Sequence, residues 1–403
     1  MSAAFELAAP PRILFGSGVI GEVAAIAHGL GTRPLLVTGR AATRAASLLD
    51  SLHGAGLTPV TFAVAGEPTV AVVRDGTAAA LDAGCDLVIA CGGGSALDAG
   101  KAIAALLGNG GDPLDYLEVV GRGRPLERAG APFIAVPTTA GTGSEVTRNA
   151  VLASPEHQMK ASLRSPHMLA RAAVVDPDLL AGLPPSVIAS SGLDALSQLI
   201  EPFLSARANP VTDALAREGI RRSARSLRRA HEQAVQAARA GARPQVHDDP
   251  AGAAETREDL ALASLLGGLC LANAGLGAVH GFAAPIGGTW PAPHGAACAA
   301  LLPHAMRINL RALETRAPAH PARDRMREVA TMLTGHADAT AADGITWLDA
   351  LCAALAVPGL GHYGVTEADV AGLVQKAKVA SSMKANPLPL TDDELTELAT
   401  RAL

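Results

Sequence analysis

Aromatic residues are scarce in this chain of 403 residues, of which phenylalanine, tryptophan and tyrosine make up only 2%. Apolar residues nevertheless account for 49%, so the interior must consist of closely packed alanine, leucine and valine rather than large rings. A core of this kind favours helices. Because the chain also exceeds the length at which a single core keeps growing, the sequence predicts two domains.

A strong net charge is also lacking, since the formal charge is -5 and the isoelectric point lies near 6.2. So small an imbalance creates no field that would draw the chain to nucleic acid or to an anionic membrane. The arginines between Arg217 and Arg229 are more simply the solvated side of a helix whose apolar face carries Ile220 and Leu227. We therefore predict a small-molecule partner and no nucleic-acid partner.

Cysteine is infrequent, and the five cysteines form no CxxC pair, which argues against a disulfide framework. The first residues contain no basic segment followed by a long apolar core, so no secretory signal is visible. The span from Leu260 to Gly288 lacks Asp, Glu, Lys and Arg, but its glycine, asparagine and histidine content favours a buried helix and turn over a membrane span. These absences predict a cytoplasmic protein with no membrane partner.

Short apolar runs alternate with helical stretches in the first part of the chain. The predicted strands lie at residues 13–15, 34–38, 60–62, 87–90, 133–136 and 173–175. Such alternation indicates a parallel α/β sheet. The strand signal fades after Pro184-Pro185-Ser186, which is typical of a helix start. The sequence therefore predicts a Rossmann-like α/β domain over residues 1–183 and an all-α domain over residues 184–403.

Two loops in the first half suit a dinucleotide. The glycines from Gly92 to Gly94 follow a strand and precede a helix, so the backbone can approach a phosphate and the helix N-terminus can receive it. This run is not a GxGxxG fingerprint, and alone it could be a tight turn. The second loop, residues 137–145, carries hydroxyls suited to a ribose or amide edge. Two such loops favour ligand binding at the carboxyl edge of the sheet.

Four residues in the second half could hold one divalent metal ion. Asp194 and Gln198 stand four residues apart and therefore share a helical face, and His280 and His294 follow far downstream. Carboxylate and imidazole suit Fe(II) or Zn(II), whereas the neutral amide of Gln198 is a weaker ligand. Taken singly, Asp194 could be a helix N-cap, His280 a core histidine and His294 a loop residue. Taken together they predict a weakly bound divalent metal.

These segments together resemble the iron-containing (group III) alcohol dehydrogenase family, which includes lactaldehyde and butanol reductases and maleylacetate reductases. The likeness covers nearly the whole chain and rests on four segments: the run from Gly92 to Lys101, the loop from Pro137 to Glu145, the segment from Gly192 to Leu196, and the surroundings of His280 and His294. It implies the dehydroquinate-synthase-like fold of that family, with a nicotinamide cofactor on the α/β domain and a metal on the helical domain. It also implies a homodimer or a higher homo-oligomer.

The resemblance assigns pyrophosphate to the glycine loop, nicotinamide and ribose to the hydroxyl-rich loop, and a lysine to the cofactor as well. The predicted cofactor-binding residues are Gly39, Arg40, Gly92, Gly93, Gly94, Ser95, Asp98, Thr138, Thr139, Thr142, Ser144 and Lys160. The predicted metal ligands are Asp194, Gln198, His280 and His294, and Asp194, His280 and His294 are also the predicted catalytic residues.

Three positions depart from the family pattern. Gln198 stands where a histidine is usual, which weakens the metal site. Ala284 stands where many members have a second histidine, so a proton must come from solvent, a ribose hydroxyl or Thr142. Gly39 stands where NAD-preferring members often have an acid, and Arg40 beside it could either pair with a 2′-phosphate or be a plain surface residue. The last departure predicts tolerance of, or preference for, NADP(H), so that the predicted cofactor is NADP(H) or NAD(H).

The predicted function is therefore NAD(P)-dependent, metal-assisted hydride transfer between an alcohol and an aldehyde or ketone. One alternative is a metal-independent enzyme that resembles maleylacetate reductase. Another is a non-catalytic dinucleotide-binding protein whose metal site has decayed.

Overall fold

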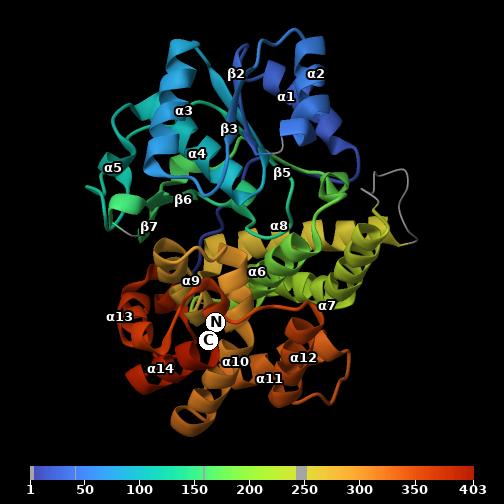
Figure 1. The fold of residues 1–403 in the computed structure, drawn as a ribbon, viewed down its shortest axis with the longest axis vertical. Helices are drawn as coiled ribbons and strands as arrows, with labels where there is room; N and C mark the ends of the chain where they lie inside the picture. Colours follow the sequence, from blue (N-terminus) through green and yellow to red (C-terminus); the bar gives the residue numbers. More distant parts are fainter. Residues whose placement is uncertain (1–3, 41, 158, 242–251) are drawn as a thin grey trace. The chain divides into compact units, whose positions relative to one another are not determined.

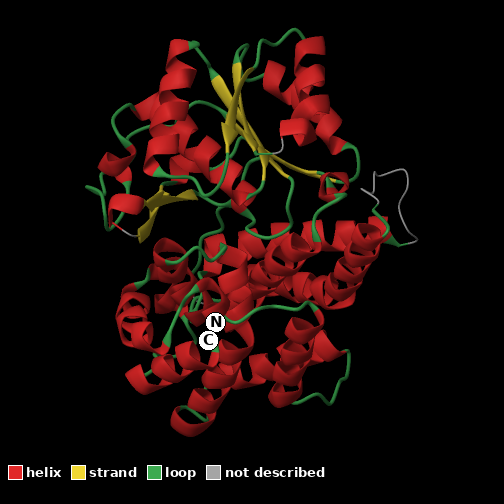
Figure 2. Cartoon of the chain, in the orientation of Figure 1, coloured by secondary structure: helices red, strands yellow, loops and turns green. Residues whose placement is uncertain are grey.

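The structure is a computed structural model that describes residues 4–40, 42–157, 159–241 and 252–403. The chain forms two compact units. The α/β unit comprises Ala8–Thr139 and Gly143–Ala181, and the helical unit comprises Ala140–Thr142 and Gly182–Leu403 with the N-terminal residues up to Leu7. Strands occur among the described residues of the first unit, whereas the second consists of helices and loops there (Figures 1 and 2). The predicted fold class is confirmed.

A six-stranded parallel sheet is the centre of the α/β unit, with strand order β1-β8-β5-β4-β2-β3. Its strands are β1 (Ile13–Phe15), β2 (Pro34–Gly39), β3 (Val60–Val64), β4 (Leu87–Gly92), β5 (Phe133–Pro137) and β8 (Ala172–Val175). All six coincide with predicted strands. The antiparallel pair β6 (Asn149–Ser154) and β7 (Met159–Arg164) goes beyond the prediction. Its buried side chains stand at alternate positions, and only β6 contains an apolar run, residues 150–153.

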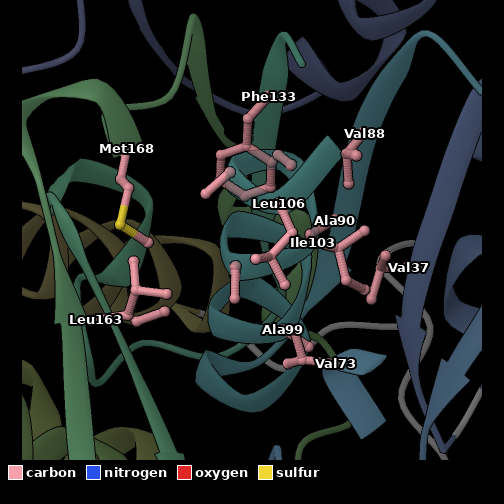
Figure 3. Close-up of a cluster of buried hydrophobic side chains, with 14 of the residues drawn as sticks. Val37, Val73, Val88, Ala90, Ala99, Ile103, Leu106, Phe133, Leu163 and Met168 are labelled. Carbon is pink, nitrogen blue, oxygen red and sulfur yellow. The ribbon is translucent and has the colours of Figure 1, made fainter. Parts of the chain in front are cut away.

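The central strands are continuously apolar because both faces of the sheet are covered. Leu35 and Val37 of β2 belong to one buried core and Leu36 to the other. Figure 3 shows the first core, in which Val88 of β4 and Ile103 of α4 belong to the same cluster. The α-helices of this unit are α1 (Val23–His28), α2 (Ala46–Gly54), α3 (Val70–Asp82), α4 (Gly94–Asn109) and α5 (Pro113–Tyr116). Residues of α3 and α4 line the first core, and residues of α1 and α2 line the second.

The first α-helix of the helical unit is α6, which starts at Pro185, within the predicted helix start Pro184-Pro185-Ser186. Its helices are α6 (Pro185–Leu204), α7 (Pro210–Arg239), α8 (Ala253–Ala274), α9 (Ala278–Thr289), α10 (His294–Arg316), α11 (Ala322–Thr334), α12 (Ala341–Ala354), α13 (Val370–Val379) and α14 (Asp392–Arg401). Among the described residues no single helix is long and apolar enough to cross a membrane. Only α8 and α9 together reach that length and composition, and the chain bends by 100° between them.

Candidate metal and cofactor sites

Four side chains of the helical unit converge on one point. One ligand atom each of Asp194, His280, His294 and Cys298 lies within 4.8 Å of the other three. Asp194 Oδ1 is 3.2 Å from His280 Nε2 and 3.9 Å from His294 Nε2. The Cys298 sulfur is 3.8 Å from His280 Nε2 and 3.7 Å from His294 Nε2. Three predicted metal ligands therefore meet, and a thiol that the motifs did not predict joins them.

Three helices build this cluster (Figure 1). Asp194 lies on α6, His280 near the start of α9, and His294 and Cys298 on the first turns of α10. His294 and Cys298 stand four residues apart, so both side chains project from one face of α10. Gly295 permits α10 to start against α6, because a β-carbon at this position would lie 2.5 Å from the carbonyl oxygen of Ser190. A larger residue at 295 would push the two helices apart.

Glu201 holds His280 from the side of the ring opposite the cluster. One Glu201 oxygen lies 2.6 Å from His280 Nδ1, and the other accepts the Val279 N–H at 2.7 Å. An ionised Glu201 keeps a proton on Nδ1 and so leaves Nε2 available as a ligand, an arrangement typical of metal-binding histidines. Glu201 is absent from the predicted set. Its only signal in the sequence is its position seven residues after Asp194, on the same face of α6.

Gln198 lies on that face between Asp194 and Glu201. Its side chain is buried, and its Oε1 has no hydrogen-bond partner among the residues that the structure describes. Leaving a buried polar atom unsatisfied costs about 1–3 kcal/mol. A cation at the cluster would offset that cost. The orphaned oxygen and the neighbouring carboxylate and imidazoles therefore fit a divalent metal ion.

The pKa shifts in the cluster follow from burial and from neighbouring charge. Burial by itself would raise the pKa of Asp194, but the imidazoles of His294 and His280 outweigh it and the pKa is lowered. Burial opposes protonation of His280, yet Cys298, Glu201 and Asp194 together raise its pKa well above the ordinary value. Burial raises the pKa of Cys298 to about 12. A metal ion that binds here therefore displaces protons from its ligands.

In the α/β unit the predicted cofactor loops follow β2, β4 and β5, which are neighbours in the sheet. The Thr138 N–H donates to the Gly92 carbonyl at 2.9 Å. A β-carbon on Gly92 would lie 3.2 Å from the backbone nitrogen of Gly39, and one on Gly93 would lie 3.2 Å from Thr139 Oγ1. Five predicted cofactor residues thus meet at one edge of the sheet, which is where parallel α/β sheets bind ligands.

The helix α4 begins directly after Gly93. Its N-cap residue, Gly93, has no side chain with which to cap the terminus, so the N–H groups of the first turn, where Gly94 and Ser95 lie, can serve an anionic ligand. A β-carbon on Gly92 would lie only 2.6 Å from that of Ala96. Glycine at 92 is therefore required for the close approach of β4 to this helix start.

Two predicted cofactor residues, Asp98 and Ser144, bind each other. The Ser144 hydroxyl donates to Asp98 Oδ1 at 2.5 Å. The buried Lys101 ammonium donates to the carbonyl oxygens of Ser144 and Asn149 at 2.7 and 2.8 Å. Burial lowers the pKa of Lys101 to about 8 and raises that of Glu145 to about 7. These buried hydrogen bonds connect the hydroxyl-rich loop to α4. Direct contact of Asp98 and Ser144 with the cofactor stays a prediction.

Three further predicted residues are Arg40, Lys160 and Thr142. Arg40 donates from Nε and Nη2 to the Ala65 carbonyl at 3.0 and 2.7 Å, which holds its guanidinium next to the end of β2. Lys160 lies on β7 and pairs with Glu67 at 3.2 Å. Thr142 belongs to the helical unit. Their roles toward a cofactor stay predictions.

Comparison with known proteins covers both units. A family model described as iron-containing alcohol dehydrogenase matches residues 10–177, and one described as the C-terminal part of the Fe-containing alcohol dehydrogenase family matches residues 188–403. The chain is 34% identical to 1,3-propanediol dehydrogenase of Klebsiella pneumoniae over 99% of its length and 98% of the relative. It is 30% identical to lactaldehyde reductase of Escherichia coli (strain K12), over 95% of this chain and 96% of the relative.

Solved structures are similar over the full length. The crystal structure of a 1,3-propanediol oxidoreductase superposes with a TM-score of 0.88 at 31% identity and covers 100% of both chains. That of sulfoacetaldehyde reductase from Bifidobacterium kashiwanohense, in complex with NAD+, superposes with a TM-score of 0.82 at 28% identity and covers 99% of both.

Proposed function

Because the chain belongs to the iron-containing alcohol dehydrogenase family, we propose that Asp194, Gln198, His280 and His294 hold the divalent metal of its reaction. The family prediction is confirmed, and the chain is an NAD(P)-dependent alcohol dehydrogenase or aldehyde reductase. The convergence of Asp194, His280 and His294 within 4.8 Å supports these ligands. The unpaired buried oxygen of Gln198 supports the fourth.

The metal, when bound, polarises a substrate carbonyl as a Lewis acid, and the nicotinamide supplies or accepts the hydride. Glu201 keeps the His280 proton on Nδ1, and Asp194 contributes the anionic oxygen. Helix α9 places Ala284 one turn after His280, so no imidazole there can relay a proton. We assign proton delivery to solvent, a cofactor ribose hydroxyl or Thr142.

Metal analysis and chelation test this ligand set. We expect the freshly purified protein to contain a divalent metal, to lose activity on chelation, and to regain it with Fe(II), Zn(II), Mn(II) or Co(II). Gln198→His should bind metal more tightly because imidazole is a better ligand than an amide, and Gln198→Ala should bind it less tightly. Full activity of thoroughly metal-free protein would refute the role of the metal.

For the cofactor, the proposed pyrophosphate site is Gly92–Gly94 with the first turn of α4, and the proposed nicotinamide and ribose site is the hydroxyl-rich loop. The proposed adenosine end is Gly39 and Arg40, with NADP(H) preferred. Gly39 supplies no carboxylate to repel a 2′-phosphate, and the Ala65 carbonyl anchors the Arg40 guanidinium beside it.

Steady-state kinetics with both cofactors test this preference. Arg40→Ala should raise KM for NADPH and leave KM for NADH nearly unchanged. Arg33→Ala is the matched control, because Arg33 precedes β2 at the opposite end of the strand. A strong preference of the unmodified protein for NADH would contradict the proposal.

The substrate that we propose is a small aliphatic or lightly substituted aldehyde and its alcohol, since the residues that follow His280 are mostly small and apolar. We also propose a cytoplasmic homodimer or higher homo-oligomer. The five free thiols support a reducing compartment, and the family resemblance supports self-association. Sedimentation analysis tests the assembly, and a monomer at micromolar concentration would overturn it.

A further inference from the structure

We propose that Cys298 is a direct metal ligand, so that the site is an Asp194–His280–His294–Cys298 set that selects zinc, with Gln198 as an additional weak donor. This inference rests on the proposed metal-dependent function. It adds a thiolate that the family motifs do not contain, and it assigns the metal specificity of the site to that thiolate.

The donor separations match a tetrahedral ion. With Zn–S near 2.3 Å and Zn–N or Zn–O near 2.0–2.1 Å, tetrahedral angles place a sulfur and a nitrogen about 3.6 Å apart, and a nitrogen and an oxygen about 3.3 Å apart. The Cys298 sulfur is 3.8 and 3.7 Å from the two histidine nitrogens. Asp194 Oδ1 is 3.2 Å from His280 Nε2 and 3.9 Å from His294 Nε2. All four atoms thus lie near the spacing of one coordination shell.

The contacts of Cys298 also differ from those of the other cysteines in the helical unit. Cys270 donates its S–H to the Thr212 carbonyl, and Cys352 donates to the Ala299 carbonyl. The hydrogen-bond distances of Cys298 run instead to two imidazole nitrogens that are themselves proposed ligands. Cys298 is fully buried, so its sulfur faces the other candidate ligands rather than solvent.

The charge inside the ligand shell would change as well. Asp194 with two neutral imidazoles and the amide of Gln198 gives a divalent ion only one negative charge in its ligand shell, because the Glu201 carboxylate lies outside that shell, against His280 Nδ1. A Cys298 thiolate adds a second anionic donor to the ion itself. Metal binding releases the thiol proton to solvent as the sulfur–metal bond forms. Because thiolate is a soft ligand, the exchange of an imidazole on α6 for sulfur on α10 shifts the preference toward zinc.

Absorption spectroscopy of the cobalt-loaded protein tests this coordination independently of activity. Co(II) bound to a thiolate shows an intense near-ultraviolet sulfur-to-metal charge-transfer band, whereas its weaker visible bands report Co(II) in a low-symmetry site with any ligands. We expect both in the unmodified protein. Cys298→Ser should lose the charge-transfer band, keep the visible bands, and bind zinc at least tenfold less tightly. Cys352→Ser is the matched control and should keep both bands.

Each outcome separates this inference from the function on which it rests. Visible bands without a charge-transfer band in the unmodified protein would overturn the thiolate ligand and leave the proposed metal site standing. A charge-transfer band that persists in Cys298→Ser would likewise overturn it. Failure of the unmodified protein to take up cobalt or zinc would overturn the metal site and this inference together. Because the unmodified spectrum decides the main question, the inference stays testable even if a variant does not fold.

Discussion

Glu201 is the residue through which the metal affinity of the site can be changed without touching a ligand. Its carboxylate accepts the Val279 N–H at 2.7 Å and faces His280 Nδ1 at 2.6 Å. In Glu201→Gln, the amide oxygen can still accept from Val279, but the amide NH2 then faces His280 Nδ1. His280 must either lose that bond or move its proton to Nε2, the nitrogen that faces the cluster.

Both outcomes weaken metal binding. Replacing the partner that orients a ligating histidine typically lowers metal affinity 10- to 100-fold, or about 1.4–2.7 kcal/mol. We therefore expect the dissociation constant for zinc, measured by competition with a chromophoric chelator, to rise by that factor in Glu201→Gln. The pH at which binding is half-maximal should fall, because the Glu201 carboxylate helps to raise the pKa of His280, and without it protons compete less with the metal for Nε2.

Glu328→Gln is the matched control. Glu328 lies in the same unit, pairs with Arg217 on the surface, and does not touch the cluster. The Glu328→Gln variant should bind zinc with the same affinity as the unmodified protein. If Glu201→Gln folds normally and binds zinc within twofold of the unmodified protein, then Glu201 does not set the orientation of His280 and the reasoning above is wrong.

Three further predictions concern the α/β unit. Burial raises the pKa of Glu145 from 4.5 to about 7, so between these pH values the folded state holds a proton that the unfolded state releases. The free energy of unfolding should therefore fall by at most about 3 kcal/mol as the pH rises from 4.5 to 7. This fall should be smaller in Glu145→Gln when urea midpoints are compared over that range, and identical pH profiles of the two proteins would contradict the prediction. Gly92→Ala places a β-carbon 2.6 Å from the β-carbon of Ala96. This change should lower the free energy of unfolding by about 1–3 kcal/mol and raise KM for the cofactor. Gly54→Ala, which has open space around the new β-carbon, should change neither quantity. Lys101→Met removes the ammonium that donates to oxygens of Ser144, Thr147 and Asn149. The free energy of unfolding should fall by about 3–5 kcal/mol. A fall of less than about 1 kcal/mol would show that these hydrogen bonds do not stabilise the loop.

The central strands β2, β4, β5 and β8 could be predicted because burial on both faces makes them nearly continuous apolar runs. The edge strands β1 and β3 are only partly buried, and their place in the alternation of strands and helices indicates them. The β6–β7 pair lies outside that alternation, and its residues include charged side chains such as Lys160 and Arg164. Local composition identifies elements that are buried on all sides. It says little about a strand pair whose stability depends on a neighbour that is distant in the sequence, as with the bridge between Thr69 and Ala153.

The cofactor loops show a related limit. Glycine runs after strands indicate close backbone approach, and the meeting of Gly39, Gly92 and Thr138 agrees with that expectation. The sequence does not reveal that Asp98 and Ser144 bind each other, because their partnership depends on the fold that brings α4 against the loop at residue 144. A polar residue in a binding motif can therefore shape the loop as well as contact the ligand.

The candidate metal site shows the same dependence on the fold, because its possible ligands come from α6, α9 and α10. On α6 alone, Gln198 in place of a histidine reads as the loss of a ligand. The structure places Cys298 of α10 within 3.8 Å of His280 Nε2, so a donor that α6 lacks can be supplied from α10 by a residue one turn after His294. Neither residue is informative alone: the amide of Gln198 predicts a weak site, and a buried cysteine predicts only an inert core thiol. If Cys298 binds the metal, the site keeps its number of strong donors but has a soft thiolate in place of an imidazole. The identity of the bound metal, rather than the presence of a metal, should then distinguish this chain from relatives with a histidine at position 198.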